Sequence, residues 1–159
     1  MTYSRSSVLR VLEIVLRIGL GGIFIYAAYV KLKDPWALFA MNIESYKVLP
    51  LWAVELVART LPWFELAVGL LLIAGIFRRI ATIATSILLL LFFSLMVRAY
   101  VTGQEINCGC FGPGEVISWK TLLRDGSMLA AALFITAMSF LRKRRTAQPA
   151  PEPQPAYGA

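Results

Sequence analysis

The feature that most constrains this chain is an uninterrupted apolar run from Ile80 to Val97. The run holds 18 residues and no charged side chain. As a helix rising about 1.5 Å per residue, it nearly crosses a hydrocarbon core of about 30 Å. The whole chain is 58% hydrophobic and 16% charged, whereas a soluble domain averages about 45–50% apolar and about 25% charged residues. The sequence therefore predicts a membrane-embedded all-α protein.

Three further apolar runs contain charged residues but are long enough to span a bilayer. They cover residues 8–30, 61–77 and 119–141. In the first and the last of them the charges lie toward one end, where long side chains can reach the lipid headgroups. With the central run, extended to 80–100, they predict a four-helix membrane bundle forming one domain over residues 8–141.

The segment between the first two spans, residues 31–60, is too charged to cross the membrane and too apolar to be a free loop. Asp34 and Pro35 are typical of a helix start, and apolar residues then recur at helical spacing from Trp36 to Tyr46. We expect a short amphipathic helix that lies on the outer membrane surface.

The residues just before the second span have two interpretations. Leu51 to Thr60 forms either a second surface piece or an outward extension of the span, with Pro62 as a kink. The sequence leaves both open.

Basic residues predict the orientation. Two basic clusters, Arg78–Arg79 and Arg142–Arg145, directly adjoin apolar runs, and such clusters favour the cytoplasmic side. Both termini are then cytoplasmic, including a proline-rich, disordered tail over residues 146–159. That side carries nine basic and two acidic side chains, and the other side carries seven of each. Anionic lipid headgroups explain the net charge of +7, so we expect no nucleic-acid partner.

The chain has no histidine and only two cysteines, Cys108 and Cys110. Haem ligation by histidine, histidine-based zinc sites and Ser-His-Asp or Cys-His catalysis are excluded. Two cysteines are also too few for a tetrathiolate site within one chain, so we expect no metal cofactor.

The cysteine pair lies in the connection between the third and fourth spans, which the predicted orientation places outside the cell. Disulfides persist in that oxidising compartment. A bridge across one residue removes little chain entropy and departs from relaxed geometry, so it would be easily reduced. The glycines at positions 109, 112 and 114 would supply the unusual backbone angles. The pattern favours a labile disulfide that exchanges electrons with an extracytoplasmic thiol partner.

Three other interpretations of the pair stay open. In the first, the cysteines are two reduced thiols in a turn. In the second, they are two soft ligands of a Cu(I) ion, and in the third they are half of a four-thiolate site shared by two copies of the chain.

Three charged residues lie at the same outer level as the cysteines: Lys31, Glu65 and Arg98. Charges at membrane depth are costly unless they are paired or wetted, which marks a candidate functional site. Lys31 or Arg98 would favour a cysteine thiolate, and Glu65 would relay a proton. In the structural alternative the two basic side chains extend to the headgroups and Glu65 pairs with one of them. Arg124 and Asp125 are expected to form a plain ion pair.

Aromatic residues also gather on the outer side, including all four tryptophans and four of the six tyrosines. They form either an interfacial anchor or a pocket for a ring-shaped ligand. For a membrane quinone, the candidate binding residues are Trp63, Tyr100 and Lys31.

Four motifs resemble the DoxX/MauE family of small membrane proteins. They are Lys31-Leu32, Leu61-Pro62-Trp63-Phe64-Glu65, Gly75-Ile76-Phe77-Arg78-Arg79 and Asn107-Cys108-Gly109-Cys110-Phe111-Gly112. The resemblance implies a four-helix bundle of the bacterial plasma membrane that is associated with extracytoplasmic redox work. It links the chain to maturation of methylamine dehydrogenase, through MauE, and to a thiosulfate:quinone oxidoreductase subunit, through DoxX.

The leading hypothesis is a thiol/disulfide redox protein that passes electrons from an extracytoplasmic thiol partner to a membrane quinone. Its catalytic candidates are Cys108, Cys110, Glu65 and Arg98. The alternative is a non-catalytic anchor or assembly subunit that holds a soluble redox enzyme at the membrane. A transporter is disfavoured, because the spans show no polar seam and no paired broken helices.

Overall fold

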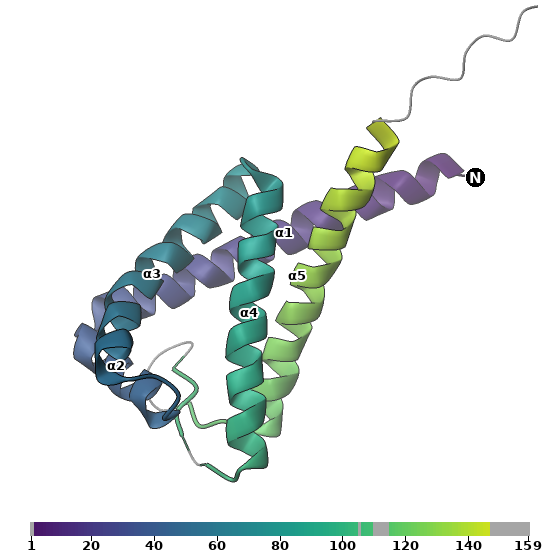
Figure 1. The fold of residues 1–159 in the computed structure, drawn as a ribbon. Helices are drawn as coiled ribbons and strands as arrows, with labels where there is room; N and C mark the ends of the chain where they lie inside the picture. Colours follow the sequence, from purple (N-terminus) through teal and green to yellow (C-terminus); the bar gives the residue numbers. More distant parts are fainter. Residues whose placement is uncertain (1, 105, 110–114, 147–159) are drawn as a thin grey trace, which may run out of the picture.

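A computed structural model describes residues 2–104, 106–109 and 115–146 of the chain. In this described part it has five helices: α1 (Thr2–Lys33), α2 (Trp36–Ser45), α3 (Leu51–Ala74), α4 (Arg78–Val101) and α5 (Trp119–Thr146) (Figure 1). The predicted all-α class is confirmed.

Three of the helices are long and apolar enough to cross a membrane. They are α3, α4 and the Trp119–Leu141 part of α5, and at most 33% of each apolar window is buried inside the protein. Large apolar side chains therefore cover their outward faces, as lipid contact requires. The prediction of a multi-pass membrane protein is supported.

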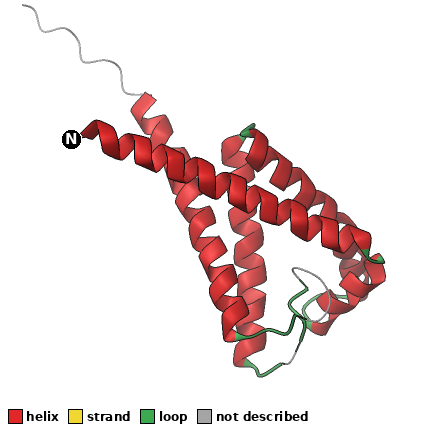
Figure 2. Cartoon of the chain, turned by 180° about the vertical axis from the view of Figure 1, so that it is seen from behind, coloured by secondary structure: helices red, strands yellow, loops and turns green. Residues whose placement is uncertain are grey.

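The helices associate mainly as two pairs, α1 with α3 and α4 with α5. Figure 1 shows α1 running obliquely behind the other long helices, and Figure 2 shows the same crossing from the opposite side. The predicted four-helix bundle is not confirmed, because α1, which contains the predicted span 8–30, is not among the three described helices that are long and apolar enough to cross a membrane, and it runs obliquely to the others. The beginning of α1 and the end of α5 lie at one end of the molecule, which we call the terminal half. We call the opposite end, with α2 and the cysteine loop, the loop half.

The α1–α3 pair is close because a glycine of each helix faces the other. A Cβ atom on Gly21 would lie 2.9 Å from the carbonyl oxygen of Gly69, and a Cβ atom on Gly69 would lie 2.9 Å from that of Gly21. Small residues let helix backbones approach closely where water provides no driving force for association.

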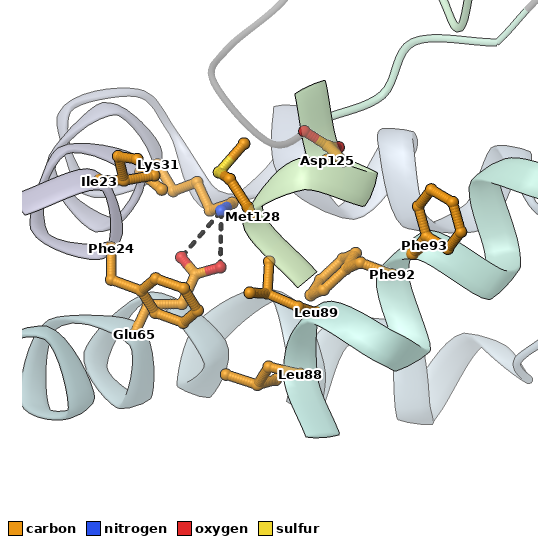
Figure 3. Close-up of a pocket in the computed structure, with 11 residues that line it drawn as sticks. Ile23, Phe24, Lys31, Glu65, Leu88, Leu89, Phe92, Phe93, Asp125 and Met128 are labelled. Carbon is orange, nitrogen blue, oxygen red and sulfur yellow. Dashed lines mark hydrogen bonds and ion pairs between the residues drawn. The ribbon is translucent and has the colours of Figure 1, made fainter. Parts of the chain in front are cut away.

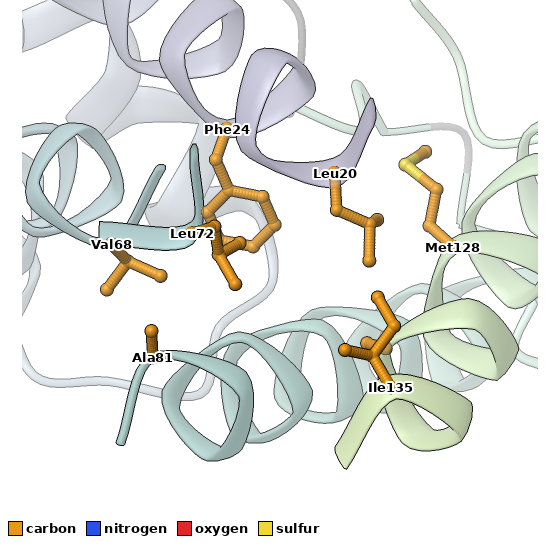
Figure 4. Close-up of a cluster of buried hydrophobic side chains, with 8 residues drawn as sticks. Leu20, Phe24, Val68, Leu72, Ala81, Met128 and Ile135 are labelled. Atoms are coloured by element: carbon orange, nitrogen blue, oxygen red, sulfur yellow. The ribbon is translucent and has the colours of Figure 1, made fainter. Parts of the chain in front are cut away.

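The largest apolar cluster lies in the terminal half, where α3 turns into α4. It contains residues from all four long helices (Figure 4): Leu20, Phe24, Val68, Leu72, Ala81, Met128, Ala132 and Ile135. Gly75, with a positive φ of 70°, ends α3 and lets the chain reverse into α4. The two helices then diverge toward the loop half.

The helix bounds decide one question that the sequence left open and confirm one prediction. α3 begins at Leu51 and contains Pro62 in its interior, so the stretch before the second span is a continuous extension of that helix and not a separate surface piece. α2 is present as predicted, with Pro35 immediately before its first residue, Trp36.

Candidate functional site

The described residues of the loop between α4 and α5, which are 102–104, 106–109 and 115–118, lie between α2 and the α4–α5 pair (Figures 1 and 2). Asn107 and Val116 form an isolated antiparallel bridge. Next to it, the backbone N–H of Cys108 donates to the carbonyl oxygen of Glu115 at 2.8 Å. The Tyr46 hydroxyl donates to the carbonyl oxygen of Cys108 at 3.3 Å. These contacts hold the first cysteine inward, with 2% of its surface exposed.

The turn that follows Cys108 needs a glycine. Gly109 has a φ of +71°, and a Cβ atom there would lie 3.2 Å from Cβ of Asn42 on α2. The prediction of an unusual backbone angle is confirmed at this position. Cys110 lies outside the described residues, as do Gly112 and Gly114, so the predicted Cys108–Cys110 disulfide stays a prediction.

The Cys108 sulfur faces two acceptors. Its Sγ lies 3.7 Å from Sδ of Met96 and 4.0 Å from Oδ2 of Asp125. Both neighbours are buried, with exposed fractions of 0% and 6%. A thiol has one proton, so it can donate to only one of them at a time.

Asp125 is held from its other side by Arg124. Nε of Arg124 lies 2.8 Å from Oδ1 of Asp125, and Nη1 of Arg124 also pairs with Glu115. The ion pair predicted between Arg124 and Asp125 is therefore present. One carboxylate oxygen of Asp125 faces a cation and the other faces the thiol.

Lys31 and Glu65 form a second buried ion pair, between α1 and α3. Lys31 Nζ lies 2.8 Å from both carboxylate oxygens of Glu65 (Figure 3), and the two side chains are only 4% and 7% exposed. The ammonium group also lies 5.2 Å from the centre of the Phe39 ring, within the range of a cation–π interaction. Lys31 thus points into the protein and not toward the headgroups.

A small cavity lies between the Lys31–Glu65 ion pair and Asp125. It has a volume of about 50 Å³, and Lys31, Glu65 and Asp125 are its charged lining residues, among apolar side chains that include Phe24 and Leu89. Figure 3 shows the lysine–glutamate pair apart from Asp125 across this space. A cavity of this size has room for water.

A larger apolar groove opens where α3 and α4 diverge. It has a volume of about 470 Å³ and is lined by α2, α3, α4 and Cys108. Its few polar groups include Asn42 and Tyr46, both near the cysteine. Apolar pockets with a few placed polar groups are typical ligand sites.

The remaining predicted site residues lie elsewhere. Trp63 on α3 and Tyr100 on α4 are 61% and 49% exposed, and Arg98 is exposed near the end of α4. None of the three lines the small cavity or the groove. In the described residues the structure places Lys31 and Glu65 at the small cavity and Cys108 at the neighbouring groove, and leaves Trp63, Tyr100 and Arg98 at the surface.

Sequence reasoning missed the contact between Asp125 and the thiol, although a signal was present. Five residues recur at helical spacing along α5 and are all buried: Thr121, Asp125, Met128, Ala132 and Ile135. A carboxylate on the buried face of such a helix needs a partner inside the protein.

Comparisons with known proteins identify the family of this chain. The family model described as "Methylamine utilisation protein MauE" matches residues 9–138. The chain belongs to the MauE family. A MauE relative, the "Methylamine utilization protein MauE" of Paracoccus denitrificans, is 34% identical over 123 residues, covering 76% of this chain and 66% of that protein. The chain therefore spans just under two thirds of the relative's length. No solved structure matches the chain.

Proposed function

We propose that this MauE family member is a membrane thiol/disulfide redox protein that carries electrons from an extracytoplasmic thiol partner to a membrane quinone. The observation that supports this most is the position of Cys108, which is buried beside a carboxylate and lines a large apolar groove. The wider DoxX resemblance and the outward orientation of the loop belong to this proposal.

In the first step, the partner dithiol reduces a Cys108–Cys110 disulfide. A partner thiolate attacks one sulfur, the bond between the two cysteines breaks, and a mixed disulfide forms. The second partner thiol resolves it, so the partner leaves as a disulfide and both cysteines become thiols. Because Cys108 is 2% exposed, we assign the attacked sulfur to Cys110.

In the second step, the two thiols are oxidised again by the quinone. Two electrons and two protons leave the thiols, the disulfide forms, and the quinone becomes a quinol. We place the quinone in the apolar groove and not at Trp63 and Tyr100, because Cys108 and Asn42 line the groove. The Asn42 amide is a hydrogen-bond donor for a quinone carbonyl.

The family supports a proposal for the partner. The relative is named for methylamine utilization, and the resemblance implies maturation of a disulfide-containing dehydrogenase. We propose that the electron donor is an extracytoplasmic protein of methylamine utilisation whose cysteines must be oxidised.

The test uses purified full-length protein in proteoliposomes with a soluble quinone and a small dithiol. The Cys108→Ser and Cys110→Ser variants are expected to lower the quinone-dependent dithiol oxidation to the protein-free rate. Ser94→Ala is the matched control, because Ser94 also lines the groove but bears no thiol, and it should retain the wild-type rate. Equal rates in wild type and cysteine variants would contradict the redox function.

A non-catalytic anchor or assembly subunit is the second candidate. The burial of Cys108 favours it, since a protein partner cannot contact a thiol that is 2% exposed. In that case wild-type proteoliposomes show no quinone-dependent oxidation, yet still retain a soluble methylamine-utilisation protein on the membrane.

A further inference from the structure

We infer that Asp125 is the proton acceptor of the Cys108 thiol, taking the proton when the sulfur forms a disulfide and returning it when the disulfide is reduced. This inference rests on the proposed redox function and adds a catalytic residue to it. Neither the sequence motifs nor the family match assigns Asp125 a role.

The geometry around the thiol supports this role. Oδ2 of Asp125 lies 4.0 Å from Sγ of Cys108, at the outer limit of a hydrogen bond to sulfur. The other candidate acceptor, the Met96 thioether, is a weak acceptor with no proton affinity near neutral pH. Of these two neighbours, the carboxylate is the one that can take the proton away.

The placement of Asp125 also fits a proton acceptor. Cys108 lines the groove, whereas Asp125 lines the small cavity on the other side. An oxidant in the groove would therefore approach the sulfur without displacing the carboxylate. Leu88 and Phe92 line both spaces and thus separate the groove from the cavity.

Arg124 keeps the carboxylate in position. Its Nε bonds Oδ1 of Asp125 at 2.8 Å, and its Nη1 pairs with Glu115. The oxygen that faces the thiol is therefore not the oxygen that faces the guanidinium. Across the cavity, the other charges are Lys31 and Glu65, which are bonded to each other. The Tyr46 hydroxyl lies at the cysteine carbonyl.

The step balances in protons and electrons. When Cys108 attacks a disulfide, its S–H bond breaks and the proton goes to Asp125. The sulfur bonds one sulfur of the disulfide, the old S–S bond breaks, and the leaving thiolate takes a proton, from Asp125 or from water. With a quinone, the two thiols give up two electrons as their disulfide forms, and the two protons that the quinol gains balance the proton held by Asp125 and the proton of the Cys110 thiol.

The first measurement does not require quinone activity. In a Cys110→Ser background Cys108 is the only cysteine, so the infrared S–H stretching band reports its hydrogen bond alone. Asp125→Asn is expected to shift this band. Glu44→Gln is the matched control, because it makes the same carboxylate-to-amide change at an exposed residue of α2, and it should leave the band in place. An unchanged band in Asp125→Asn would overturn the inference.

The second measurement follows exchange between Cys108 and a small apolar disulfide across a pH series, in the same background. With Asp125 as base, the wild-type rate falls less steeply toward low pH than the rate of Asp125→Asn, in which no carboxylate takes the thiol proton. At the low-pH end of the series we expect Asp125→Asn to lose about 100-fold, the low end of general acid–base catalysis. Glu44→Gln should stay within about twofold of wild type, since general-base assistance is intact in it.

The outcomes separate the two proposals. If both measurements respond to Asp125→Asn but no quinone-dependent oxidation occurs, the proton acceptor is supported and the quinone function fails. If the pH profiles of wild type and Asp125→Asn coincide, Asp125 serves only to hold Arg124 and the inference is wrong, whatever the quinone assay shows.

Discussion

The two halves of this molecule are built differently. In the terminal half, the long helices converge on one apolar cluster that includes Leu72, Ala132 and Ile135, each 1% exposed. In the loop half, α3 and α4 diverge around a groove of about 470 Å³, and ion pairs and a thiol are buried beside it. Dense packing stabilises a fold, whereas a groove with buried polar groups costs stability. The contrast suggests that one half holds the protein together and the other carries its chemistry.

The largest expected effect breaks this simple division, because it comes from an ion pair of the loop half. Lys31→Met leaves the Glu65 carboxylate buried without its cation, and breaking a buried pair costs about 3–5 kcal/mol. Chemical unfolding in bicelles measures the loss. The double variant Lys31→Met/Glu65→Leu should recover most of it, because an apolar pair avoids the unpaired charge. A double variant as unstable as the single one would show that the pair itself is needed.

The next effect tests the terminal half. Leu72→Ala leaves a cavity in the main cluster, which costs about 2–5 kcal/mol. The same unfolding assay measures it. Leu70→Ala is the control on the same helix, since Leu70 is 53% exposed, and it should change stability little. Quinone-dependent oxidation per folded molecule should be equal in both variants, and a selective loss in Leu72→Ala would contradict the division of roles.

A smaller effect is expected at the α1–α3 contact. Gly69→Ala places a methyl group 2.9 Å from the Gly21 carbonyl oxygen, and such overpacking costs about 1–3 kcal/mol. Gly22→Ala is the comparison, because a Cβ atom there meets nothing within 4 Å. Both are assayed by thermal unfolding in the same lipid. Equal stability would mean that the helices separate without cost.

The smallest effect on stability is expected from a substitution in the groove, and it tests whether the loop half binds the quinone. Leu91→Trp introduces an indole ring at a residue that lines the groove and is 58% exposed. Its stability should change by no more than about 0.5 kcal/mol, while the apparent KM for the quinone rises. Leu90→Trp, at a neighbouring residue that is 51% exposed and absent from the groove lining, should leave the KM unchanged. Equal KM values would place the quinone outside the groove.

Local patterns predicted the helices of this protein well, because each rests on a run of neighbouring residues. The uncharged run from Ile80 to Val97 lies inside α4, and the spacing after Pro35 marks α2. Pro62 did not show whether the second membrane helix begins before or after it, since proline is tolerated inside membrane helices when neighbouring groups compensate the lost hydrogen bond. Its place within α3 depends on packing and not on the local sequence.

The site was less accessible to sequence reasoning, because its contacts join distant parts of the chain. Glu65 was expected to pair with Lys31 or Arg98, and the choice of Lys31 depends on how α1 crosses α3. The inward fold of Cys108 depends on Tyr46 and on the bridge beside Glu115. No local sequence pattern predicts which residues make contact when they are far apart in the chain.

The lysine–glutamate pair also bears on how the chain enters the membrane during synthesis. A single charged side chain at the centre of an inserting helix costs about 2.5–3.5 kcal/mol, and Glu65 lies in the interior of α3, one of the three helices long and apolar enough to span. Inserted alone, α3 would meet that cost, whereas beside α1 its carboxylate is neutralised by Lys31. We therefore expect α1, which is synthesised first, to stay at the insertion site until α3 has been synthesised.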